Sequence, residues 1–187
     1  MPAPVLVAIS VAADPAAWVD AGFSVTDAAI AVGGVSIEFV AGDGGIVGWT
    51  LGDTAPDSSS PAHANGVTEI DHVVMLTPSL ERTIDELEAQ GIELRRIREG
   101  ETGMGTHRQA FFRVGRPVLE VVEADERARF WGVTFTTADI DATAALLGDK
   151  LGRVKAAVQP GRRIATIRRE AGLGLPVALI SPKPRDP

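Results

Sequence analysis

The sequence predicts an α+β fold built from tandem βαβββ modules, with a shortened extra module at the N-terminus. Two observations support this prediction. Residues 68–124 contain short apolar runs and one helical repeat in the order strand, helix, strand, strand, strand. Residues 130–182 repeat that order, with Thr137 aligned on Thr77, 60 residues earlier. Copies of one supersecondary unit cover each other's apolar sheet faces, so the repeat predicts a shared core.

The module at residues 68–124 has the strongest local signals. Residues 73–76 are apolar and rich in β-branched side chains, which predicts a buried strand. Thr77 and Pro78 are typical of a helix start, and Gly91 of a helix end, so an amphipathic helix is expected between them. Glycines then separate three further expected strands, at residues 93–97, 109–114 and 118–122.

Residues 1–52 have the features of an abbreviated copy of this module. The segment VGGVSIEFV, residues 32–40, aligns with VGRPVLEVV, residues 114–122. This alignment puts Glu38 at the position that Glu120 holds in the next module. A short helix and two further strands are also expected, the strands at residues 5–10 and 46–51.

Two segments are predicted to lie outside the modules. Residues 53–67 are rich in Pro, Ser and Ala and lack an apolar period, which predicts a linker or long surface loop with a solvated His63. Residues 183–187 are too rich in Pro to continue a strand, which predicts a tail.

Composition restricts the function classes. The 187 residues include no cysteine, which excludes disulfides, thiolate metal sites and cysteine nucleophiles. The formal net charge of −7 argues against a nucleic-acid partner, because phosphate binding needs a basic surface. No apolar run is long enough to cross a membrane, so we expect no membrane partner and a cytoplasmic location.

Two residues interrupt apolar strands and are candidates for chemistry. Glu120 stands within the otherwise apolar residues 118–122, and a buried ionised carboxylate is costly without a partner. It could equally face solvent from a one-sided sheet, since apolar neighbours alternate with it. His72 follows Asp71 at the start of a strand, where the imidazole could be a ligand or could only hydrogen-bond its neighbour. The residues alone leave both alternatives open.

Three further residues are candidates for contacting a ligand. His107 follows the glycine-rich segment GETGMGT and is expected on a loop at the edge of a sheet. Arg162 and Arg163 follow a Pro-Gly turn, where guanidinium groups could hold a carboxylate or phosphate at the rim of a cavity. Solvated surface side chains are the alternative for all three.

Three segments carry a resemblance to a known superfamily: IDHVVMLTPSLERT, QAFFRVGRPVLEVVE, and FWGVTFTTADIDA followed by AVQPGRRIAT. With them, the chain resembles the vicinal oxygen chelate superfamily, which includes glyoxalase, bleomycin resistance proteins, extradiol dioxygenases and methylmalonyl-CoA epimerase. It is most similar to bacterial glyoxalase-like proteins. The resemblance covers residues 67–182 well and residues 4–51 weakly. It implies paired modules that form half-open, barrel-like sheets around a cavity, and a homodimer.

The resemblance also implies a metal site, because family members carry ligands on the first and last strands of each module. His72 holds the first-strand position and Glu120 the last-strand position, with Glu38 as the matching residue of the first module. These three would bind a divalent ion such as Zn, Ni, Mn or Fe, and Glu120 could also act as the catalytic proton carrier. The third module departs from the pattern, with Gly132 and Leu179 at the expected ligand positions.

The function that the resemblance implies is a metal-dependent lyase, isomerase or dioxygenase acting on a small oxygenated substrate. The alternative is a metal-free protein that binds and sequesters a small molecule, as the resistance members do. The missing ligands of the third module favour the alternative. A purely structural or partner-binding role is a third possibility, so the sequence leaves open whether the chain is an enzyme.

Overall fold

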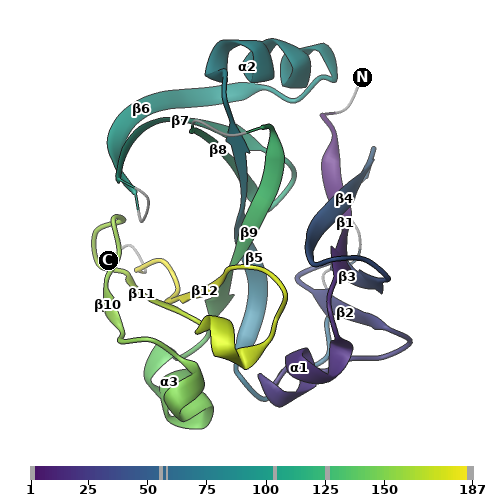
Figure 1. Cartoon of the computed structure of the whole chain (residues 1–187), viewed down its shortest axis with the longest axis vertical. Coiled ribbons are helices and arrows are strands. Elements are labelled where there is room, and N and C mark those ends of the chain that lie inside the picture. Colours follow the sequence, from purple (N-terminus) through teal and green to yellow (C-terminus); the bar gives the residue numbers. More distant parts are fainter. Residues whose placement is uncertain (1–2, 55–56, 58, 103–104, 125–126, 185–187) are drawn as a thin grey trace.

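The chain folds into two open sheets with few helices, which confirms the predicted α+β class. The computed structural model describes residues 3–54, 57, 59–102, 105–124 and 127–184. Within them, a four-stranded sheet has the order β2-β3-β1-β4, and an eight-stranded sheet has the order β10-β11-β12-β9-β5-β8-β7-β6 (Figure 1). No helix among these residues is long and apolar enough to cross a membrane.

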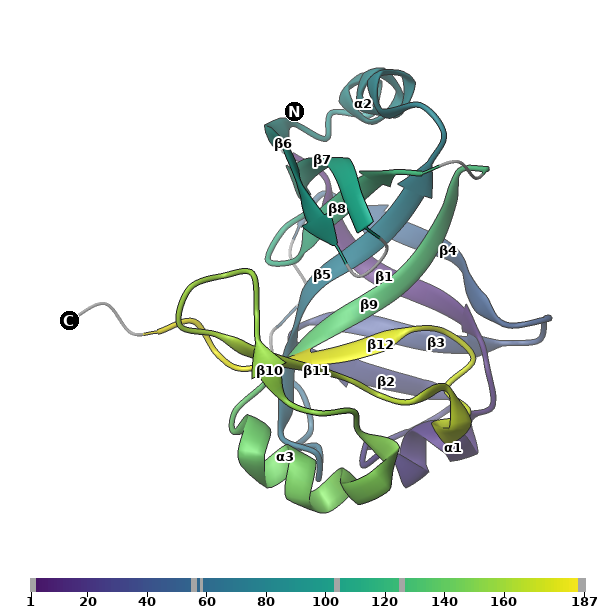
Figure 2. The same cartoon turned by 60° about the vertical axis from the view of Figure 1, so that its left-hand side comes forward.

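The eight-stranded sheet is built from the second and third βαβββ units. In each unit the first strand runs parallel to the last, and the two first strands, β5 and β9, run antiparallel side by side at the centre (Figure 2). The second unit contains β5 (Val67–Thr77), α2 (Leu80–Ala89), β6 (Leu94–Thr102), β7 (Gly105–Arg113) and β8 (Val118–Glu123). The third contains β9 (Arg129–Thr137), α3 (Ile140–Leu147), β10 (Lys155–Ala156), β11 (Arg163–Thr166) and β12 (Val177–Ile180). Short 3-10 turns, Gly148–Lys150 and Arg169–Ala171, complete the third unit.

The start of α2 differs from the prediction by two residues. Ser79, not Thr77, is the N-cap, and its hydroxyl accepts a hydrogen bond from the Arg82 amide. Thr77 ends the strand, and its hydroxyl lies 2.7 Å from the Thr83 hydroxyl. The third unit repeats this contact with Thr137 and Thr143, 2.6 Å apart. The 60-residue repeat therefore extends to buried polar contacts that tie each helix to its first strand.

Strand register corrects one detail of the repeat. Val74 pairs with Glu120 in the second unit, and Thr134, 60 residues after Val74, pairs with Ala178. Ala178 therefore holds the position equivalent to Glu120, one residue before the predicted Leu179. The side chain of Leu179 is fully buried in the core. Alanine cannot bind a metal ion either, so the third unit still has no ligand side chain at this position.

The four-stranded sheet contains the N-terminal unit. Its elements are β1 (Val5–Ala12), α1 (Pro15–Asp20), β2 (Ala29–Val32), β3 (Val35–Val40) and β4 (Gly45–Gly52). β1 runs parallel to β3, whereas β4 pairs antiparallel with β1, much as β9 pairs with β5. Thus β4 takes the place that the first strand of a following unit has in the larger sheet.

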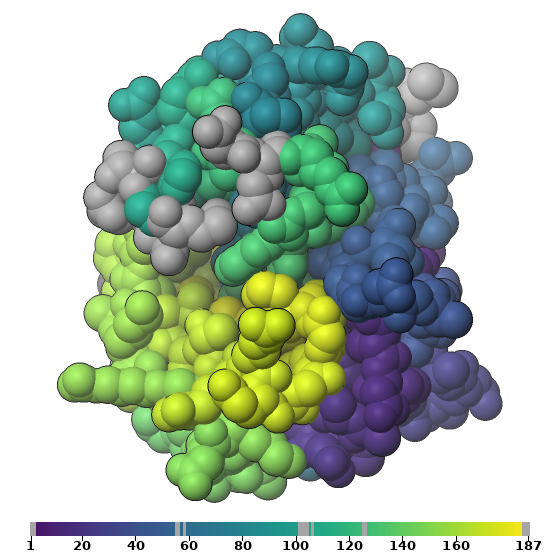
Figure 3. Space-filling model, viewed as in Figure 1, coloured from purple at the N-terminus to yellow at the C-terminus, as the bar shows by residue number. Residues whose placement is uncertain are grey.

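One hydrophobic core joins the two sheets. Trp18 of α1 is fully buried, lies edge-on to Phe135 of β9 at 6.2 Å, and donates its indole N–H to the Leu173 carbonyl. Gly45 and Gly174 are joined by a backbone hydrogen bond of 3.0 Å. In the space-filling view the purple and blue surface of the first unit adjoins the yellow surface of the C-terminal segment (Figure 3). The N-terminal unit therefore packs as part of the same body.

His63 is buried, which contradicts its expected exposure. Its Nδ1 accepts a hydrogen bond from the Ser24 amide at 3.1 Å. The proton of the neutral ring is then on Nε2, which donates it to the Ala31 carbonyl at 3.1 Å. The neighbouring Asn65 is also buried and donates to the Ala21 carbonyl. These contacts fix the end of the segment at residues 53–67 to the first unit, although its described residues before β5 form no helix or strand.

His63 should make the stability of the fold depend on pH. Burial lowers the pKa of His63 below its usual 6.5, against an opposing effect of the hydrogen bond to Ala31. The unfolded chain therefore takes up this proton first, so stability should fall as the pH drops through about 6.5 and level off below the folded pKa. We expect His63→Gln to lose less stability than the wild type between pH 7.5 and 5. Urea unfolding at both pH values measures the difference; equal losses would contradict this role.

Candidate functional site

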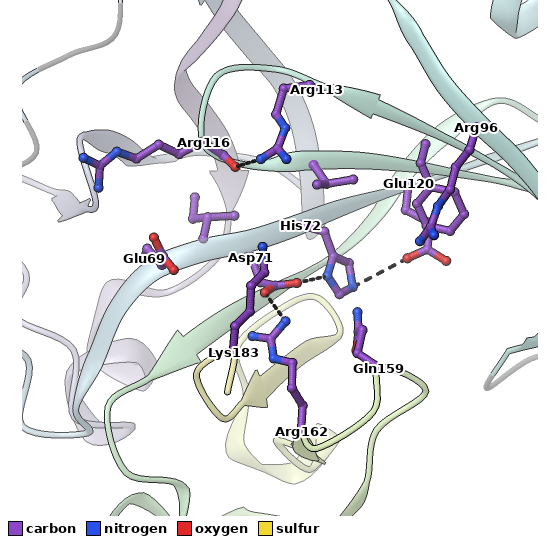
Figure 4. A pocket seen from close by; sticks show the side chains of 13 residues that line it. Glu69, Asp71, His72, Arg96, Arg113, Arg116, Glu120, Gln159, Arg162 and Lys183 are labelled. Atoms are coloured by element: carbon purple, nitrogen blue, oxygen red, sulfur yellow. Dashed lines mark hydrogen bonds and ion pairs between the residues drawn. The ribbon is translucent and has the colours of Figure 1, made fainter. Parts of the chain in front are cut away.

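A cavity of about 450 Å³ lies against the second unit's half of the large sheet. Figure 4 shows its side chains, which come from β5, β6, β7, β8, the turn between β7 and β8 and the turn before β11, with Lys183 after β12. The third unit therefore closes a cavity whose floor belongs to the second unit. Ten of its lining side chains are polar or charged: Glu69, Asp71, His72, Arg96, Arg113, Arg116, Glu120, Gln159, Arg162 and Lys183.

A β-bulge in β5 brings two consecutive side chains into this cavity. The pairing of β5 with β9 shifts between Ile70 and His72, so that Asp71 is the extra residue. Neighbouring side chains of a regular strand point to opposite faces, and a bulge changes this alternation. Asp71 Oδ1 consequently lies 2.8 Å from His72 Nδ1.

Asp71 is held as a carboxylate from two sides. Arg162 Nη1 lies 2.7 Å from its Oδ2, and Arg162 Nε donates to the Ser181 carbonyl at 2.8 Å. Burial acts to raise the pKa of Asp71, but the hydrogen bonds and charges of His72 and Arg162 outweigh it and lower the pKa to about 2. Because an ionised carboxylate can only accept, His72 Nδ1 must carry a proton toward it.

The other nitrogen of His72 faces Glu120. His72 Nε2 lies 3.6 Å from Glu120 Oε2, and the two side chains are only 14% and 16% exposed. This separation is longer than a hydrogen bond, so a proton can pass between the two groups only after a small approach or through a water molecule. A histidine oriented by one carboxylate, with its free nitrogen near a second, is an arrangement suited to general acid–base chemistry.

The second oxygen of Glu120 is fixed by a buried amide. Gln109 Nε2 donates to Glu120 Oε1 at 2.7 Å, and Gln109 Oε1 accepts from Arg98 Nε at 2.6 Å. Since Arg98 can only donate, it sets the orientation of the amide and keeps the NH₂ group on Glu120. Gln109 is 1% exposed, so water cannot easily replace it. Polar contacts therefore run from Arg98 to Glu120 and from His72 to Arg162, and the 3.6 Å gap between His72 and Glu120 separates the two sets.

The geometry brings together three of the residues that the sequence singled out, His72, Glu120 and Arg162. The other three lie outside the lining. Glu38 is exposed on β3 of the four-stranded sheet. His107 lies within β7, opposite Gly100, and not on a loop, because the strand already begins at Gly105. Arg163 is half exposed and pairs with Asp141.

Several cavity residues were not identified from the sequence. Asp71 was noted only as the neighbour of His72, because regular alternation would point it to the other face. Gln109 and Arg96 belong to strands whose register a single sequence does not reveal. Lys183 was assigned to the tail, yet it lines the cavity. The run of arginines at residues 95–98 was the one sequence signal for these residues, and it points to Arg96.

The residues fit a divalent ion only in part. His72 Nε2 and Glu120 Oε2, 3.6 Å apart, are spaced as two ligands of one ion could be, and Asp71 supplies the carboxylate that metal-binding histidines usually contact. The described residues, however, contain no group of three or more His, Asp or Glu side chains able to hold an ion. At Gly132 a side chain is excluded, since a Cβ would lie 2.7 Å from the Pro176 carbonyl oxygen. Catalytic zinc sites use three protein ligands, so this set is incomplete.

Comparison with known proteins supports the fold. No family model and no curated protein matches the chain. Among solved structures, methylmalonyl-CoA epimerase from Mycobacterium tuberculosis is similar with a TM-score of 0.52 and 17% identity, covering 64% of this chain and 91% of that one. A Streptomyces coelicolor methylmalonyl-CoA epimerase variant in complex with 2-nitronate-propionyl-CoA gives 0.51 and 24%, covering 63% and 99%. A hypothetical protein from Bacillus halodurans gives 0.52 and 10%, covering 64% and 97%.

These neighbours are covered almost completely, whereas about a third of this chain lies outside each match. At such identities the likeness concerns the fold. Methylmalonyl-CoA epimerase is a member of the superfamily that the sequence segments resemble. Its structure is similar to that of this chain, although no family model matches the sequence. The chain therefore shares the βαβββ fold of these structures.

Proposed function

We propose that the chain is an enzyme that moves a proton on a small oxygenated substrate, in the manner of an isomerase or lyase. The observation that carries the proposal is the Asp71–His72–Glu120 arrangement, in which an ionised carboxylate orients a histidine whose free nitrogen lies 3.6 Å from a second carboxylate inside a cavity. Each of these groups is positioned by a bulge, a buried arginine or a buried amide, and not by a mobile surface contact.

In the proposed reaction Glu120 takes a proton from a carbon next to a carbonyl group. Gln109 holds one carboxylate oxygen and leaves the other directed at His72. His72 then accepts or returns the proton through Nε2, while Asp71 stabilises the charged imidazole. Positioned acid–base groups of this kind contribute about 10²- to 10⁴-fold in rate. Arg96, stacked on Phe111 at 4.6 Å, stands near Glu120 and could stabilise negative charge on the substrate oxygen (Figure 4).

The similar structures support the choice of reaction class. Two of the three structures described above are named methylmalonyl-CoA epimerase, and one of these is a complex with 2-nitronate-propionyl-CoA. Homodimer formation and a cytoplasmic location remain predictions of the sequence.

The test is deuterium exchange in D₂O with a panel of 2-oxo acids and α-hydroxy ketones, followed by NMR. We expect loss of one C–H signal of a panel member that depends on the protein concentration. A panel member that binds but exchanges no faster than without protein would overturn the proposal. That result would favour the second candidate, a metal-free binding protein, which the alanine and glycine at positions 178 and 132 already support.

A divalent ion, if bound, would act as a Lewis acid held by His72 and Glu120, with water or substrate completing its ligands. Because two protein ligands hold an ion weakly, we expect protein purified without chelators or an affinity tag to contain well under one metal ion per chain. Elemental analysis measures this content. Near-stoichiometric metal that disappears in both His72→Ala and Glu120→Ala would contradict the expectation and establish a chelate site.

A further inference from the structure

Four cationic side chains of the cavity have no acidic partner among the described residues. They are Arg96, Arg113, Arg116 and Lys183. Outside the cavity, Arg82, Arg95, Arg108 and Arg163 each pair with a carboxylate at 2.5–3.3 Å, whereas Arg98 and Arg168 contact uncharged groups. Of the described arginines and lysine that line the cavity, Arg162 pairs with a carboxylate, that of Asp71. The other four charges are available to a ligand that enters the cavity.

The cavity has an excess of positive charge. Arg162 and Asp71 neutralise each other, which leaves the four unpaired cations against Glu69 and Glu120. The whole chain, by contrast, carries a net charge of −7. A cleft of one sign raises the local concentration of the opposite ion and steers its approach. The cavity therefore favours anionic ligands, although the protein as a whole is negatively charged.

The cations are arranged asymmetrically around the reactive pair. Arg96 lies with Glu120 on one side of His72, and Arg113 and Lys183 lie on the other side, whereas the Arg116 side chain extends away from both (Figure 4). The turn that carries Arg113 and Arg116 is anchored to β1, because Leu6 N–H donates to the Val114 carbonyl at 3.0 Å. Arg113 Nη1 also donates to the Arg116 carbonyl at 3.1 Å, which orients its guanidinium group.

We propose that this cationic pair, Arg113 and Lys183, binds an anionic group of the ligand, a carboxylate or a phosphate. The substrate is then a small acid whose anionic group lies on the pair and whose reacting carbon lies at Glu120. Planar guanidinium groups suit either anion, because both offer two oxygens to one fork. The placement of the reacting carbon at Glu120 rests on the proposed function, whereas the anion site itself does not.

Binding of two probes, inorganic phosphate and malonate, tests the anion site. We compare the wild type, Arg113→Met and Arg163→Met by isothermal titration calorimetry at 50 and 200 mM NaCl. The two variants lose the same charge, but of the two residues Arg113 lines the cavity and Arg163 does not. Loss of one charge-assisted hydrogen bond should raise the Kd of Arg113→Met about tenfold. Arg163→Met should bind as the wild type does, and binding should weaken at the higher salt concentration.

The two probes distinguish the sources of the anionic group, because tighter malonate binding indicates a carboxylate and tighter phosphate binding a phosphoryl group. Absence of binding to the wild type, or equal effects of the two variants, would overturn the anion site. Binding that Arg113→Met weakens, together with no deuterium exchange on any substrate, would retain the site and reject the proposed enzyme.

Discussion

Replacing Arg162 with methionine should lower the free energy of unfolding by about 3 kcal/mol. The Arg162 side chain is 3% exposed, and its removal leaves the Asp71 carboxylate largely buried with only His72 to compensate it. Removing one partner of a buried ion pair is costly for this reason, even where the intact pair adds little. The methionine retains most of the aliphatic volume, so the change tests charge rather than packing. Urea unfolding followed by tryptophan fluorescence provides the measurement.

Arg163→Met is the matched control. This neighbouring arginine pairs with Asp141 at the surface, where both side chains are about half exposed or more. Exposed ion pairs contribute between about 0 and 1 kcal/mol, so this variant should unfold nearly as the wild type does. A double variant, Asp71→Leu with Arg162→Met, should recover part of the lost stability because no unpaired charge remains buried. Similar losses in the two single variants would show that Arg162 is not the partner that keeps Asp71 ionised.

Replacing Glu120 with glutamine should reduce deuterium exchange about 10²- to 10⁴-fold. The amide oxygen can still accept the hydrogen bond from Gln109, so the local packing is kept while the proton acceptor is lost. Binding of malonate should remain within about threefold of the wild type, since Arg113 and Lys183 are intact. The exchange rate and the Kd are measured on the same preparations, which separates loss of chemistry from loss of binding.

Glu38→Gln is the informative control for this prediction. It makes the same change at the position that aligns with Glu120 in the first unit, but its side chain is exposed on the other sheet. We expect its exchange rate to equal that of the wild type. A loss as large as that of Glu120→Gln would mean that Glu38 reaches the site in an arrangement that the single chain does not have.

The sequence predicted the parts of this protein that depend on periodicity. The amphipathic repeat of α2 and the 60-residue spacing of the threonine contacts follow from local pattern, and the structure contains both. Positions that depend on pairing between strands were less accessible. Leu179 was aligned with Glu120, but the register of β12 on β9 assigns that position to Ala178. A shift of one residue turns a side chain to the other face of a sheet.

The candidate site was predicted in part for the same reason. His72 and Glu120 occupy strands that alignment placed correctly relative to each other, so both line the cavity. Glu38 matches the pattern equally well, yet its unit forms a separate sheet whose order no local signal specifies. Burial of His63 depends on contacts with Ser24 and Ala31, far away in sequence, and composition alone suggested solvent.

The bulge at Asp71 makes the site sensitive to the length of β5 as well as to its residues. Deletion of Ile70 would let Asp71 pair with Phe135 next to the His72–Thr134 pair, and so remove this register shift between β5 and β9. The sheet would persist, but the aspartate and the histidine would no longer share a face, even if both were still present. A related chain could therefore lose this chemistry by a one-codon deletion while every candidate site residue stays recognisable in an alignment.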